Sequence, residues 1–106
     1  MIYKCTGLLL PALLLALLTG CASTPALDEE AQRQRLHQAA KTNVQLGIEY
    51  MREGDMEMSL NKFEKALELN ANDVKALRNR ARAYQKLGLE DKANADLELI
   101  KQLSIQ

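Results

Sequence analysis

The sequence predicts an all-α protein, and three observations indicate this fold class. Strong helix formers, chiefly Ala, Leu, Glu, Lys, Gln and Arg, dominate the 106-residue chain, whereas Gly, Pro and aromatic residues are few. Apolar residues recur at helical spacing in the second half of the chain, as at Leu77, Ala81 and Tyr84. The chain also resembles itself when it is shifted by 34 positions, which brings Tyr50 onto Tyr84. We therefore expect a repeated helical unit in one small domain.

Residues 1–20 are expected to form a signal peptide that is cleaved. Lys4 supplies a positive charge, and the apolar run at residues 8–18 is too short to span a bilayer, which needs about 20 residues. The sequence Leu18-Thr19-Gly20-Cys21 resembles the lipobox of bacterial lipoproteins, in which an apolar residue and two small residues precede a Cys. The resemblance implies that lipid is attached to the sulfur of Cys21. The plainer interpretation is a secretory leader that has a Cys there by chance.

The resemblance to lipoproteins also implies a location. In enteric bacteria, Asp after the lipidated Cys retains a lipoprotein in the inner membrane, and this chain has Ala22 after Cys21. The rule therefore implies lipid anchoring at the periplasmic face of the outer membrane. Because Cys5 leaves with the leader and Cys21 is modified, we expect no disulfide in the mature protein.

Two short segments join the lipidated end to the repeats. Residues 21–27 are small and turn-prone, which is typical of a tether. Residues 28–40 form either a solvated linker or a helical extension, and the spacing of Leu36 and Ala40 favours the extension. His37 is the only His and has no acidic or thiol cluster in register, so we expect it to be a solvated surface residue.

The 34-residue period resembles that of the tetratricopeptide repeat (TPR), a helix–turn–helix unit. We place one repeat at residues 41–73 and a second at residues 74–106. The alternative is a generic four-helix bundle with accidental self-similarity. The resemblance implies that Gly47 and Ser59 are small so that two helices approach closely. The matching positions are Leu46, Gly47, Tyr50, Gly54, Ser59, Phe63 and Ala66 in the first copy, and Leu77, Ala81, Tyr84, Gly88, Ala93 and Leu97 in the second.

Turn residues mark the expected ends of four helices. Turns are expected at residues 53–55, 70–73 and 87–88, with Asp55 and Asp73 as N-caps of the helices that follow. The last helix is expected to bury one apolar stripe. The residues of that stripe are Leu89, Ala93, Leu97, Ile100 and Leu103.

Composition and motifs exclude several classes of function. Because 14 basic side chains balance 14 acidic ones, no bulk charge favours nucleic acid. The sequence shows no nucleophile–base pair, no metal-ligand spacing and no glycine-rich phosphate loop. We therefore expect neither an enzyme nor a metal site, and no cofactor beyond the covalent lipid on Cys21.

Binding to a protein remains. In the TPR family the first helix of each unit lines a concave groove, and helical spacing assigns groove positions that are mostly apolar in the first unit and mostly basic in the second. This combination suits an extended partner segment with apolar and acidic residues. The plainer interpretation is a solvated charged face beside spare apolar residues. The expected partner-binding positions are Lys41, Val44, Gln45, Ile48, Met51, Lys75, Arg78, Asn79, Arg82 and Gln85.

Residues 41–54 resemble the first repeat of type IV pilus biogenesis lipoproteins (pilotins), which carry Gln-Leu-Gly-x-x-Tyr after a lipidated leader and escort an outer-membrane secretin. The resemblance implies an adaptor or assembly factor for an envelope machine, with a secretin or pilus component as its protein partner. The alternative is a structural lipoprotein that dimerises or docks within an envelope complex without groove binding. Leu99 and Ile105 fall outside the buried stripe, so we expect a second copy or another protein to cover that face.

Overall fold

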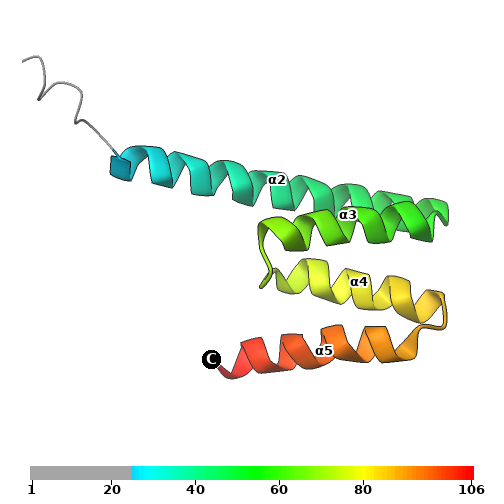
Figure 1. The fold of residues 1–106 in the computed structure, drawn as a ribbon. Helices are drawn as coiled ribbons and strands as arrows, with labels where there is room; N and C mark the ends of the chain where they lie inside the picture. The colour runs from blue at the N-terminus through cyan, green and yellow to red at the C-terminus, as the bar shows by residue number, and fades with distance from the viewer. Residues whose placement is uncertain (1–24) are drawn as a thin grey trace, which may run out of the picture. The chain divides into compact units, whose positions relative to one another are not determined.

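The computed structural model describes residues 25–106, which fold into helices only. The helices are α2 (Pro25–Glu53), α3 (Met56–Leu69), α4 (Val74–Lys86) and α5 (Glu90–Ile105) (Figure 1). The predicted all-α class is therefore confirmed for the described part of the chain. The expected signal peptide and the lipidation site Cys21 lie outside the described residues. Residues 33–106 form one compact unit, and all the packing below lies within it.

Helix α2 includes residues 28–40, for which the sequence allows either a solvated linker or a helical extension. It is described from Pro25 onward, and residues 28–40 are helical. Side chains 26–39 are exposed, and Ala40 is the first buried residue in the described range, at 1% exposure. Burial within the described range thus begins at Ala40.

The turns follow the chemistry that the sequence indicates. Gly54 and Gly88 have φ of 86° and 73°, a left-handed conformation that glycine adopts without steric cost. Asp55 caps α3 by accepting a hydrogen bond from the Met58 backbone N–H at 3.0 Å. Asp73 caps α4 by accepting from the Ala76 N–H at 3.1 Å. The predicted turns and both predicted caps are confirmed.

The core lies where α2, α3 and α4 meet. Phe63 is fully buried, and a Cβ placed on Gly47 would lie 2.4 Å from its Cε1 atom. The Ser59 hydroxyl donates to the Gly47 carbonyl oxygen at 2.8 Å, so the two small residues hold α2 and α3 together. The expected close approach of these helices is confirmed. The buried members of this cluster are Val44, Phe63, Ala66, Ala76 and Ala83.

Helices α4 and α5 lie side by side and are joined by a different kind of contact (Figure 1). The expected apolar stripe of α5 is wrong at Leu89 and Leu97, which are 41% and 40% exposed. Ala93 is buried as expected, and the next buried residue of α5 is Asp96, at 4% exposure. Asp96 can be buried at this position because its carboxylate accepts two hydrogen bonds from Arg80 of α4.

Candidate functional site

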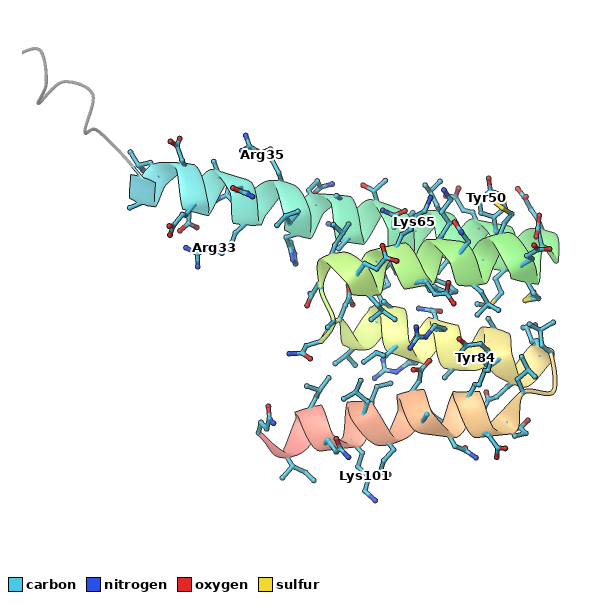
Figure 2. The ribbon with its side chains drawn as sticks, in the orientation of Figure 1. Arg33, Arg35, Tyr50, Lys65, Tyr84 and Lys101 are labelled. Atoms are coloured by element: carbon cyan, nitrogen blue, oxygen red, sulfur yellow. The ribbon has the colours of Figure 1, made fainter. Side chains whose placement is uncertain are left out.

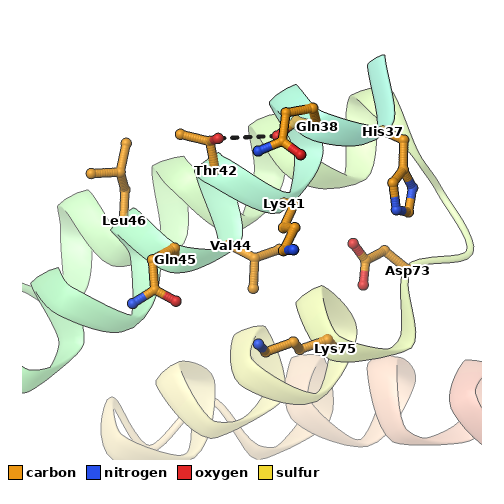
Figure 3. Close-up of a pocket in the computed structure, with 9 residues that line it drawn as sticks. All are labelled: His37, Gln38, Lys41, Thr42, Val44, Gln45, Leu46, Asp73 and Lys75. Atoms are coloured by element: carbon orange, nitrogen blue, oxygen red, sulfur yellow. Dashed lines mark hydrogen bonds between the residues drawn. The ribbon is translucent and has the colours of Figure 1, made fainter. Parts of the chain in front are cut away.

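A hollow opens between α2 and the start of α4. Its cavity volume is about 490 Å³, and Figure 3 shows the side chains that surround it. Four of the expected groove positions line it, together with residues that the sequence did not assign to the groove. The lining residues are His37, Gln38, Lys41, Thr42, Val44, Gln45, Leu46, Asp73 and Lys75.

The hollow has an apolar floor beneath two cations. Val44 is 2% exposed and belongs to the core cluster, so it forms the floor and is not the exposed contact that spacing alone indicates. Figure 3 shows Val44 pointing from α2 toward the α4 side, with Lys41 beside it and Lys75 across from it. Both lysines are exposed. An apolar group could therefore rest on Val44 while an anionic group lies between the lysines.

An acidic residue lies at one end of the same hollow. In Figure 3 the carboxylate of Asp73 and the ring of His37 face each other across the space. The Asp73 Oδ1 atom already accepts the hydrogen bond that caps α4. A carboxylate of a bound partner would be repelled at this end, so the favourable anion position is near the two lysines.

A second hollow, of about 550 Å³, lies further along the same face. It is lined by Met51 of α2 and by Arg82, Gln85 and Lys86 of α4. Three of these four were expected groove positions, so the two hollows together hold seven of the ten. Lys86 was missed, although it follows Arg82 by four residues and extends the same helical stripe.

The three remaining positions do not line either hollow. Ile48 is half-buried and packs against the core cluster, whereas Arg78 is exposed. Asn79 is half-buried, and its amide nitrogen donates to the Lys75 carbonyl of its own helix at 2.8 Å. That local bond leaves Asn79 with less capacity for a partner than its position implies.

The cations of α4 fall into two sets. Lys75, Arg78, Arg82 and Lys86 are exposed, and within residues 25–106 none of them forms an ion pair. Arg80 differs because its Nε and Nη2 atoms donate to the Asp96 carboxylate at 2.8 and 2.7 Å. The groove face therefore carries unneutralised positive charge, whereas the positive charge of Arg80 is neutralised at the interface with α5.

A cluster of half-buried and exposed polar side chains surrounds that pair and was missed from the sequence. The guanidinium carbon of Arg80 lies 5.8 Å from the centre of the Tyr84 ring, which Figure 2 shows between α4 and α5, and Lys92 Nζ lies 5.7 Å from it. Hydrogen bonding to Asp96 raises the pKa of Arg80 above its ordinary value. Burial is the main cause that raises the pKa of Tyr84. The cluster joins two helices and lies away from the groove, so we assign it to stability.

Residues 25–106 contain neither a metal-binding cluster nor a membrane-spanning helix. No group of three or more His, Cys, Asp or Glu side chains in residues 25–106 is placed to hold a metal ion. Across the same range, no helix combines the length and apolar character that a bilayer crossing requires.

Comparison with known proteins identifies the repeat. The TPR repeat family matches residues 47–88, from the second half of α2 through α3 and α4. No curated protein matches the chain. TPR repeats are generally non-catalytic modules for protein–protein interaction. Residues 47–88 thus carry a TPR repeat, and the described helices form a short TPR α-solenoid.

Proposed function

We propose that this chain is a membrane-anchored protein–protein interaction module, and that it serves as an adaptor or assembly factor for an envelope machine such as a type IV pilus or a secretin. The observation that carries the interaction part is the groove face, where two hollows combine an apolar side chain from α2 with unpaired cations from α4. The lipobox-like residues 18–21 support the anchor. The resemblance of residues 41–54 to pilotins supports the assignment to a pilus or secretin machine.

The proposed mechanism is tethering. Lipid on Cys21 confines the module to a membrane surface, which raises its effective concentration for partners in the same membrane. Two or more acyl chains are needed for stable anchoring, because one chain alone binds a bilayer only weakly. The groove then engages an extended segment of the partner.

A structural role is the second candidate, and the exposed face of α5 favours it. Leu97 is 40% exposed and Ile105 is 79% exposed, so this helix offers apolar surface to a second copy or to another protein. Charge reversal at Arg78 and Arg82 separates the two candidates. It should abolish partner capture by the groove and leave a scaffold that uses α5 unaffected.

The test is crosslinking of the native, lipidated protein in intact cells, followed by identification of the proteins that copurify. Cys21→Ala is the control, and mass spectrometry of the purified protein establishes whether lipid is present. A secretin or pilus component that is captured by the native protein and lost in the control supports the proposal. Capture of self-adducts alone, or an unlipidated Cys21, would overturn it.

A further inference from the structure

We propose that the groove recognises an extended segment carrying two pairs of neighbouring apolar and acidic residues, with the pairs about three residues apart. The inference rests on the proposed function, since it names the chemistry of the segment that the groove would hold. It is drawn from the two hollows, which share the same three chemical features.

Each hollow is lined by at least one apolar side chain, two Lys or Arg side chains and at least one glutamine. The first has Val44, Lys41, Lys75 and Gln45, and the second has Met51, Arg82, Lys86 and Gln85. The apolar group and the glutamine can contact a side chain and a peptide backbone, and the cations can bind a carboxylate. A repeated set of contacts indicates a repeated feature in the ligand.

The spacing of the hollows follows from helix geometry. Val44 and Met51 are seven residues apart on α2, and Lys75 and Arg82 are seven residues apart on α4. At a rise of about 1.5 Å per residue, seven residues of helix span about 10 Å. An extended peptide advances about 3.3 Å per residue, so about three residues cover the same distance.

Charge favours an acidic peptide over other ligands. Exposed cations line both hollows, and Arg78 adds another between them. The one carboxylate in the first hollow, Asp73, is engaged in the α4 cap. A polyphosphate or nucleic acid would satisfy the cations but would offer no apolar group to the floor of the first hollow or to Met51 in the second. The observations therefore favour a protein segment.

The test measures binding of a short peptide to the full-length lipidated protein in detergent, by fluorescence anisotropy. The probe is Leu-Asp-Ser-Leu-Asp with blocked ends, so that no terminal carboxylate contributes. Control peptides replace both Asp by Asn, replace both Leu by Ser, or separate the pairs by five positions. We expect each control to bind about tenfold more weakly than the probe or worse.

Variants test the site itself. Lys75→Glu and Arg82→Glu, one in each hollow, should each weaken binding of the probe about tenfold. Lys101→Glu on α5 is the matched control, because it reverses an exposed charge away from the groove and should leave affinity unchanged. Circular dichroism confirms that the variants remain folded.

Three results would overturn the inference. The probe and the peptide with the wider spacing could bind with equal affinity, or the groove variants could lose no more affinity than Lys101→Glu. Polyphosphate could also displace the labelled probe as well as the unlabelled probe does. These results are independent of cell crosslinking. If an envelope partner is captured but the probe does not bind, the inference fails and the proposed function stands. If the probe binds as described but no envelope partner is captured, the machine assignment fails and the ligand rule stands.

Discussion

Replacing Gly47 with Ala tests the close approach of α2 and α3. A Cβ at this position would lie 2.4, 2.7 and 2.9 Å from three ring atoms of Phe63, where carbon atoms prefer about 3.5–4.0 Å. The ring would have to move by about 1 Å, and it is fully buried against Ala66 and Ala76. The same movement would strain the hydrogen bond from Ser59 to the Gly47 carbonyl.

The expected loss of stability combines two opposing effects. Overpacking of a core costs about 1–3 kcal/mol, and the better helix propensity of Ala returns about 1 kcal/mol. We therefore expect Gly47→Ala to lower the free energy of unfolding by about 0–2 kcal/mol. Urea denaturation followed by circular dichroism measures it.

A second background makes the cause specific. In Phe63→Leu protein the Cε1 and Cζ atoms, two of the three that collide with the new Cβ, are absent, so Gly47→Ala should cost less there. The double-mutant cycle gives this coupling directly. If Gly47→Ala costs the same in both backgrounds, or stabilises the native protein, the packing explanation is wrong.

Three further perturbations address other parts of the fold. Asp96→Ala removes the partner of Arg80, whose side chain is 23% exposed, and should lower the free energy of unfolding in urea by about 2–3 kcal/mol. The double variant Arg80→Met, Asp96→Leu should recover most of that loss. Because burial raises the pKa of Tyr84, the neutral side chain stabilises the fold fully below about pH 10, and this stabilisation is lost as pH rises through the folded-state pKa. In thermal melts from about pH 9 to 12, the melting temperature of Tyr84→Phe should therefore fall less than that of the native protein. Gly88→Ala places a residue with a Cβ at a φ of 73° and should lower stability by about 1 kcal/mol in thermal denaturation. Gly88→Asn should cost less, because Asn tolerates this conformation better. An unchanged melting temperature in Gly88→Ala would argue against the left-handed turn.

The helices could be predicted from the sequence because their ends are determined locally. Asp55 and Asp73 accept hydrogen bonds from N–H groups three residues later, and Gly54 and Gly88 adopt a conformation that other residues avoid. These interactions involve only neighbours along the chain, so a single sequence contains the information. The position of Gly47 was predictable for a different reason, because the repeat pattern associates a small residue there with close helix approach.

The burial of α5 was not predictable in the same way. Leu97 corresponds to Phe63 in the repeat, and both occupy the apolar stripe of their helices. Phe63 is buried because α2 and α4 both pack around it, whereas no helix within residues 25–106 covers Leu97 in the same manner. Periodicity shows which face of a helix is apolar, but it does not show whether another element is present to cover that face.

The groove illustrates the same limit within the candidate site. Spacing placed Lys41, Val44 and Lys75 on one face, and the structure brings them to one hollow. Helical spacing did not distinguish Val44, which is buried in the core, from the exposed lysines beside it. The distinction depends on the packing of α3 beneath α2, which joins residues that are distant in sequence.

The basic stripe of α4 and the half-buried position of Arg80 follow from one geometric fact. Each residue advances about 100° around a helix, so the four exposed cations of α4 fall within an arc of about 80°, and Arg80 lies more than about 100° outside it. Arg80 therefore faces α5, where Asp96 neutralises its charge, and it cannot add to the field of the groove. A partner that is selected by charge is selected by the exposed cations of α4 together with Lys41 of α2, and not by Arg80. Loss of Asp96 should weaken the fold first and affect partner binding only as a consequence. The exposed cations of α4 are Lys75, Arg78, Arg82 and Lys86.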